Sequence, residues 1–108
     1  MEIIDYLNQC LIQLEHVQNY SPMTVASMRN AITLFVKMTK AKDLRDLTKN
    51  RIEDWLIEGR LTRNWKASTY IDYHKRFGTF LTWLVKREKI ERNFMKEMIF
   101  ERDDQNMI

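Results

Sequence analysis

Residues that form turns and covalent cross-links are scarce in this chain. Its 108 residues include two glycines, one proline and one cysteine. A lone cysteine excludes an internal disulfide and gives no metal motif, and two separated glycines exclude a glycine-rich phosphate loop. No apolar run approaches the roughly 18 residues of a membrane span, and the first five residues lack the basic opening of a secretory signal. We therefore expect no membrane partner, and the cysteine content fits a reducing cytoplasm.

Apolar residues recur at helical spacing through most of the chain. The sequence is 44% hydrophobic and 11% aromatic, which is enough to bury a core, and its composition favours helices over a sheet. Helices are predicted over about residues 2–18, 22–39, 69–88 and 94–100, with one further short helix. Together they predict an all-α fold in one domain over residues 1–100, followed by a flexible tail over residues 101–108.

The ends of these helices are marked by typical capping residues. Ser21 is an N-cap candidate followed by Pro22, which suits the first helical position. Thr48 is expected to open the short helix and Gly59 to end it, while Ser68 is expected to cap the long fourth helix.

Two helix openings match each other at a fixed offset of 45 residues. The first is Ser21-Pro22-Met23-Thr24, and the second is Lys66-Ala67-Ser68-Thr69. Bulky residues then follow at equal intervals, and the paired positions are Thr24 and Thr69, Met28 and Tyr73, Ile32 and Phe77, Phe35 and Phe80, and Val36 and Leu81. Similarity at this scale indicates a duplicated unit or equal packing demands on two crossing helices.

Positive charge is concentrated in the same two segments. Residues 21–42 contain four bases and no acid, and residues 60–92 contain nine bases and three acids. Each of the other segments, 1–20, 43–59 and 93–108, contains more acids than bases, and the net charge is +3. The distribution is typical of a basic surface for a polyanion. The alternative is a set of ordinary solvated helix faces.

No set of residues typical of catalysis is present. His16 and His74 are far apart in the sequence, and neither has the spacing of a metal motif. No Ser-His-Asp or Cys-His arrangement can be assembled, so we expect neither enzyme activity nor a cofactor. Cys10 has apolar neighbours and is interpreted as a core or boundary residue. Trp65, in the basic loop 60–66, either packs that loop onto the bundle or lies beside a ligand backbone.

Helix starts and exposed helix faces supply candidate phosphate contacts. Backbone N–H groups and hydroxyls at a helix start favour anions. On helical wheels, the faces opposite the apolar stripes mix small, polar and basic residues. His74 flanks its stripe, where it is either a phosphate contact or a boundary residue. The candidates from these two sources are Ser21, Thr24, Lys66, Ser68 and Thr69 at the helix starts, and Asn30, His74 and Lys75 from the wheels.

Several short motifs occur in an order known from one protein family. They are Ser21-Pro22-Met23-Thr24 with Met28 and Phe35; Leu44, Leu47, Thr48, Ile52, Trp55 and Leu56; Lys66, Ser68, Thr69, Phe80, Leu81, Trp83 and Leu84; and Ile90 with Asn93-Phe94. Over about residues 2–98 the chain thus resembles the core-binding domain (the SAM-like N-terminal domain) of phage-integrase-type tyrosine recombinases. It departs from the family pattern at Met28, where tyrosine is usual, and at Phe94, where proline is usual.

The resemblance implies both a fold and a function. The fold is an orthogonal, SAM-like bundle of four main helices with a short C-terminal helix. The function is to bind double-stranded DNA as half of a clamp on a recombination site, together with the protein's own catalytic domain and neighbouring protomers. The motif also places Ser27 and Tyr70 near DNA.

The family's catalytic Arg, His, Arg and Tyr have no counterpart here. The chain is therefore expected to be a fragment or truncated form of a recombinase, in the cytoplasm and of bacterial or phage origin. The alternative is a helical protein-interaction module with no nucleic-acid role.

Overall fold

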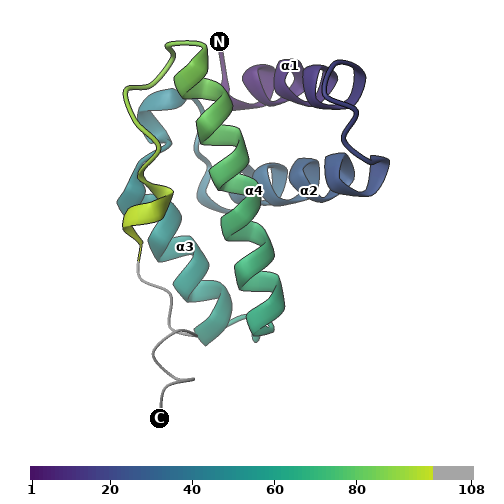
Figure 1. Cartoon of the computed structure of the whole chain (residues 1–108). Helices are drawn as coiled ribbons and strands as arrows, with labels where there is room; N and C mark the ends of the chain where they lie inside the picture. Colours follow the sequence, from purple (N-terminus) through teal and green to yellow (C-terminus); the bar gives the residue numbers. More distant parts are fainter. Residues whose placement is uncertain (99–108) are drawn as a thin grey trace.

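The computed structural model describes residues 1–98, and every regular element in that part of the chain is a helix. The elements are α1 (Ile3–His16), α2 (Pro22–Thr39), η1 (Leu44–Asp46), α3 (Lys49–Leu61), α4 (Ala67–Lys86) and η2 (Phe94–Glu97), of which η1 and η2 are 3₁₀-helices. The predicted all-α fold is confirmed (Figure 1). The end of the predicted last helix at 99–100 and the predicted tail at 101–108 lie outside the described residues.

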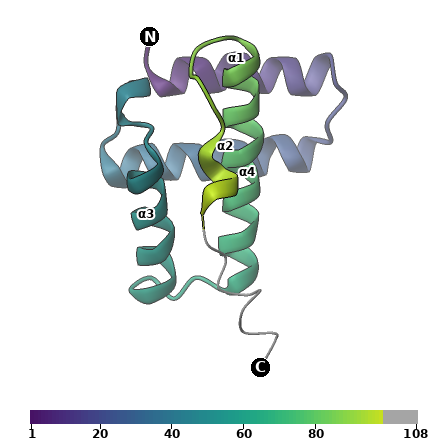
Figure 2. The ribbon, with the colours of Figure 1, turned by 60° about the vertical axis from the view of Figure 1, so that its left-hand side comes forward.

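The four long helices form two pairs that cross. Helices α1 and α2 lie side by side and run across α3 and α4, as both views show (Figures 1 and 2). Helix α2 contacts α1, α3 and α4, and η2 packs against α4. Buried apolar side chains from all four α-helices and from η2 belong to one core. The arrangement is a four-helix bundle, and its SAM-like topology stays a prediction.

The two matched helices begin at equivalent positions but are capped differently. Helix α2 follows Ser21, whose Oγ accepts a hydrogen bond of 3.2 Å from the Thr24 N–H. Helix α4 follows Lys66, which makes no side-chain capping bond. The prediction that Ser68 caps α4 is wrong, because the helix has already begun at Ala67. The 45-residue offset therefore holds for the helix starts, but not for the hydrogen bond that stabilises the first turn of α2.

Helix α3 does not stop at Gly59, as the sequence had suggested, but continues to Leu61. Gly59 is buried, and the Trp65 N–H donates a hydrogen bond of 2.9 Å to its carbonyl oxygen. A Cβ atom at this position would lie only 2.0 Å from the Trp65 ring. Glycine is needed here because the indole packs directly against the helix backbone, and not because the helix ends.

Trp65 belongs to a group of five aromatic rings between α2, α3 and α4, which we call the aromatic cluster. Trp55 lies at its centre, with ring centroids 5.4 Å from Phe35, 4.9 Å from Trp65, 5.6 Å from Tyr73 and 5.9 Å from Phe77. Most of these pairs are edge-to-face, which is a favoured geometry for aromatic rings. Of the two alternatives for Trp65, the structure favours packing of the loop onto the bundle.

Replacement of Gly59 tests this close approach. In an open helix, Gly→Ala stabilises by up to about 1 kcal/mol. At Gly59 the methyl group would meet the Trp65 ring, so we expect Gly59→Ala to lower the free energy of unfolding by roughly 1–3 kcal/mol. The matched control is Gly78→Ala in α4, where a Cβ meets nothing within 4 Å and should stabilise the chain. Urea unfolding measures both, and equal effects of the two substitutions would contradict this packing.

The thiol of Cys10 gives a second prediction about the core. Cys10 has no exposed surface, and burial raises the pKa of its thiol to about 12. At pH 8 its thiolate fraction should be about a thousandfold lower than in the unfolded chain. A thiol reagent such as Ellman's reagent should therefore label the chain rapidly in urea and very slowly without it. Because the pKa of the folded thiol lies above its ordinary value of 9.0, stability should also fall as the pH rises above about 9. Equal labelling rates with and without urea would contradict the burial.

Candidate nucleic-acid interface

A groove of about 570 Å³ opens between the first halves of α2 and α4. Its lining residues are Met23, Ala26, Ser27 and Asn30 of α2, and Ser68, Thr69, Asp72 and Tyr73 of α4. Four of these eight residues, Ser27, Asn30, Ser68 and Thr69, are among the DNA contacts predicted from the sequence. They come from two segments far apart in the chain, and the crossing of α2 and α4 brings them together.

A hydrogen-bond network joins the two walls of this groove. Ser27 Oγ donates to Asp72 Oδ2 at 2.8 Å, across the α2–α4 crossing. Arg76 donates from Nε and Nη2 to Asp72 Oδ1, at 3.1 Å and 2.8 Å. Ser27 and Asp72 are themselves 45 residues apart, so this bond connects equivalent positions of the two matched segments. The network fixes the width of the groove and places a carboxylate inside it, with a guanidinium beside that carboxylate.

Ser21 and Thr24 lie at the start of α2 rather than in the groove. The Ser21 hydroxyl donates a 3.0 Å hydrogen bond to the Thr24 hydroxyl and also accepts the capping bond from Thr24. The Ser21 hydroxyl is thus already used in capping, and Thr24 is half-buried. Lys66 is exposed immediately before α4. All three residues are at helix starts, as the sequence had indicated.

The remaining three predicted contacts lie away from the groove. Tyr70 is a core residue, with 8% of its surface exposed. His74 is half-buried, and its Nε2 lies 2.9 Å from the Met95 carbonyl oxygen, to which it donates. Lys75 is exposed, and both His74 and Lys75 line a second cavity further along α4. The structure therefore supports the boundary interpretation of His74, and Tyr70 is a weak candidate for contact with a ligand.

Asp72 is the residue of the groove that sequence reasoning overlooked. It lies one helical turn after Ser68 and on the same face, so a wheel could have placed it beside the predicted contacts. Negative charge disfavours a phosphate nearby. Its pairing with Arg76, whose side chain is only 21% exposed, compensates that charge within the groove.

Most of the bases in the matched segments have no acidic partner. Within residues 1–98, none of the four bases of segment 21–42 forms an ion pair. Two acids in the acidic segments form hydrogen-bonded pairs with arginines. Arg45 donates to Asp43 and lowers the pKa of that carboxyl, and Arg92 does the same for Glu97. Within residues 1–98, the four bases of segment 21–42 thus keep their charge uncompensated by an ion pair, which favours a positive surface there.

Metal chemistry has no ligand set in the described part of the chain. No group of three or more His, Cys, Asp or Glu side chains is close enough there to hold a metal ion. No helix among residues 1–98 combines the length and apolar character needed to cross a membrane. The groove offers hydroxyls, an amide and one paired carboxylate, which suit hydrogen bonding to a polar surface.

Comparisons with protein-family models, curated proteins and solved structures found no match to the chain. The resemblance to recombinase core-binding domains therefore rests on the order of the sequence motifs alone.

A double-mutant cycle tests the bond across the groove. Ser27→Ala and Asp72→Ala should each lower the free energy of unfolding, and together they should cost less than the sum of the two. The expected coupling is about 1 kcal/mol, the size of a hydrogen bond to a charged group at a partly exposed site. Urea unfolding of the four chains measures it. The pair Ser27→Ala and Asp43→Ala serves as the control, since these residues do not touch. Additive effects of Ser27 and Asp72 would show that the bond does not hold the helices together.

Proposed function

We propose that this chain is a DNA-binding domain that lays the groove between α2 and α4 against duplex DNA. The observation that supports this is the meeting of Ser27, Asn30, Ser68 and Thr69 on one surface. Hydroxyls and amides are the neutral side-chain groups that most often bond to phosphates and base edges. In this proposal Asn30, which is exposed, contacts a base edge, while Ser68 and Thr69 contact phosphates.

Charge around the groove supports the same proposal. Lys66 lies before the first turn of α4, and Lys75 lies on its exposed face one turn beyond Asp72. Neither forms an ion pair within residues 1–98. The start of α4 also has backbone N–H groups and no side-chain cap, which favours a phosphate there. These groups would bind the DNA backbone without regard to sequence.

The motif order suggests a more specific role. In this proposal the domain forms half of a clamp on the recombination site of a tyrosine recombinase, in a bacterial or phage cytoplasm. The catalytic residues would come from another domain of the parent protein, and neighbouring protomers would assemble on the DNA. Half of a clamp should bind weakly, with non-specific dissociation constants of about 10⁻⁴–10⁻⁶ M at physiological salt.

The second candidate is a helical module that binds another protein. Large exposed apolar side chains occur at Met1, Ile12, Val17, Met23, Ile57 and Leu61. They are spread over α1, α2 and α3, and Ile57 and Leu61 are the pair one helical turn apart. Isolated apolar residues of this kind are normal on a protein surface, so this candidate has the weaker support.

Titration with duplex DNA at several salt concentrations tests the proposal. The unmodified chain should bind more weakly as salt rises. Lys66→Ala/Lys75→Ala should bind more weakly still, and should reduce the slope of log K against log salt by about two. Asp72→Asn should act in the opposite direction, because it removes a negative charge from the groove.

Controls separate this surface from a general effect of charge. Lys42→Ala/Lys49→Ala removes the same charge at residues that do not line the groove, and should leave binding nearly unchanged. Absence of binding at low salt, or binding that does not depend on salt, would refute a DNA-binding role. Equal losses in the two lysine pairs, with the fold retained, would place DNA on a different face.

A further inference from the structure

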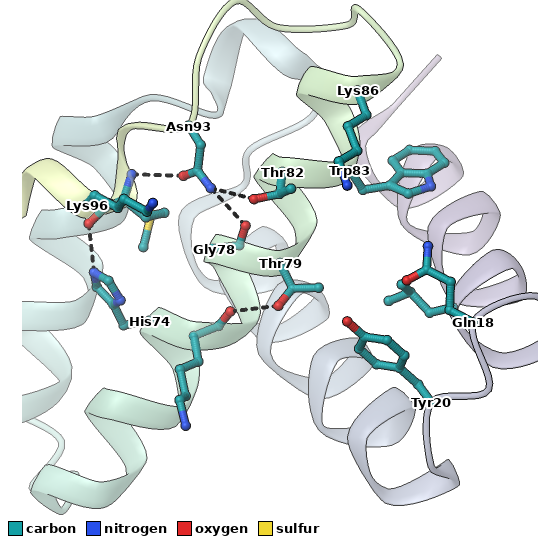
Figure 3. A pocket seen from close by; sticks show the side chains of 13 residues that line it. Gln18, Tyr20, His74, Gly78, Thr79, Thr82, Trp83, Lys86, Asn93 and Lys96 are labelled. Carbon is teal, nitrogen blue, oxygen red and sulfur yellow. Dashed lines mark hydrogen bonds between the residues drawn. The ribbon is translucent and has the colours of Figure 1, made fainter.

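A second cavity, of about 350 Å³, lies beside the later half of α4. Figure 3 shows Gln18 and Tyr20 on one side of it and Asn93 and Lys96 on the other, with Thr79 and Thr82 of α4 between them. Its size is at the lower end of the range for small-molecule sites, roughly 300–1,000 Å³. The cavity lies outside the groove that we assign to DNA, and no residue lines both.

The neutral polar groups of the cavity are held in place by one another. Asn93 Nδ2 donates to the Gly78 carbonyl oxygen at 3.0 Å and to Thr82 Oγ1 at 2.8 Å. Asn93 Oδ1 accepts from the Met95 N–H at 3.0 Å, and the Met95 carbonyl accepts from His74. These bonds, dashed in Figure 3, tie η2 to α4. One wall of the cavity is therefore ordered before any ligand arrives.

The charged groups of the cavity all have the same sign. Lys75, Lys86 and Lys96 line it, and no Asp or Glu among residues 1–98 does. None of the three lysines forms an ion pair within residues 1–98. Three lysines on one cavity give it a positive potential, which favours an anion with more than one negative charge.

Gly78 gives an independent indication that the cavity has a use. It lies inside α4, where glycine weakens a helix relative to alanine. Packing does not explain it, because a Cβ there would meet nothing within 4 Å, in contrast to Gly59. Gly78 lines the cavity, so the missing side chain leaves open space beside the lysines. A bound group would account for that space.

The walls also contain apolar surface. Trp83, which is 6% exposed, lines the cavity together with Leu14, Tyr20 and Met95. A ligand that fits must therefore combine a compact anionic group with a planar or apolar body. A free inorganic ion would leave the aromatic wall unused.

We propose that this cavity binds a phosphate monoester whose body is planar, such as a nucleotide unit. Lys75, Lys86 and Lys96 neutralise the phosphate, and the planar body lies against Tyr20 and Trp83. The nucleotide unit could come from a free mononucleotide or from the end of a nucleic acid strand. The inference does not depend on the groove binding DNA, because the two surfaces share no lining residue.

The test is a titration of the full chain with 2′-deoxyadenosine 5′-monophosphate, followed by ¹H–¹⁵N NMR. The indole N–H of Trp83 and the backbone N–H groups of Gly78 and Thr79 should shift, while the indole N–H of Trp55, in the aromatic cluster, should not. Deoxyadenosine, which lacks the phosphate, should bind at least about tenfold more weakly. Lys86→Ala/Lys96→Ala should weaken binding of the monophosphate about tenfold, whereas Lys42→Ala/Lys49→Ala should leave it unchanged.

Gly78→Ala distinguishes a binding role from a structural one. The substitution should raise the melting temperature and yet weaken binding of the monophosphate, because the added methyl group occupies the open space beside position 78 in the cavity. A variant that is more stable and binds equally well would overturn the role of Gly78. No shifts at millimolar monophosphate, or equal shifts in Lys86→Ala/Lys96→Ala, would overturn the site as a whole.

Two competition experiments identify the source of the phosphate. If a nucleic acid supplies it, single-stranded DNA with a 5′-phosphate should compete with the monophosphate, and the same strand without that phosphate should compete less. If a free nucleotide supplies it, neither strand should compete. Lys66→Ala leaves all three cavity lysines unchanged, so duplex binding by this variant reports separately on the groove. Lys86→Ala/Lys96→Ala leaves Lys66 unchanged, so each proposal can fail without the other.

Discussion

The position of Trp55 determines much of the geometry of this molecule. Its ring contacts Phe35 of α2, Tyr73 and Phe77 of α4, and Trp65 in the loop before α4. Three helices and one loop thus meet on a single side chain, and each ring restricts the others. Trp65 can join the cluster because Gly59 has no side chain. The loop is thereby fixed, and with it the place where α4 begins. Because Tyr73 also lines the groove, one wall of the candidate DNA surface is the outer side of this cluster.

The 45-residue offset has a physical explanation in this structure. The stripes on α2 and α4 both face the core, where Ile32, Phe35, Phe77 and Phe80 have no exposed surface. Where the helices cross, Ser27 meets Asp72 at the same offset. Two helices that cross at equivalent points need similar residues at similar intervals, whether or not a duplication produced them. The differing caps show that the similarity follows the packing rather than the helix ends, because the Ser21 bond has no counterpart at Lys66.

The helices could be predicted from the sequence, because the helical spacing of apolar residues and the capping residues Ser21 and Thr48 are local features of the chain. The errors arose where a distant residue decides the outcome. Gly59 looked like a helix end because nothing local shows that an indole six residues later needs the space. His74 could not be placed because its partner, the Met95 carbonyl, is 21 residues away. For the groove, the wheels identified the correct faces of α2 and α4, but only the crossing shows which residues meet and that Asp72 is among them.

Helix α4 presents two different electrostatic environments along one exposed face. In its first half Asp72, the only carboxylate that residues 1–98 contribute to the groove, is bonded to Arg76, so the pair is nearly neutral at close range. Further along, Lys75 and Lys86 of α4 and Lys96 of η2 line a cavity to which no carboxylate of residues 1–98 contributes. Attraction to anions should therefore be stronger at the cavity, where three lysines are present and no carboxylate of residues 1–98 offsets them. The groove, by contrast, has no lysine among its lining residues, and it is lined by neutral hydroxyl and amide groups and one paired carboxylate. Such a groove suits the recognition of DNA by its shape, whereas the cavity suits the binding of a single anionic group. Lys75 lines the cavity and not the groove, although it lies only one helical turn beyond Asp72.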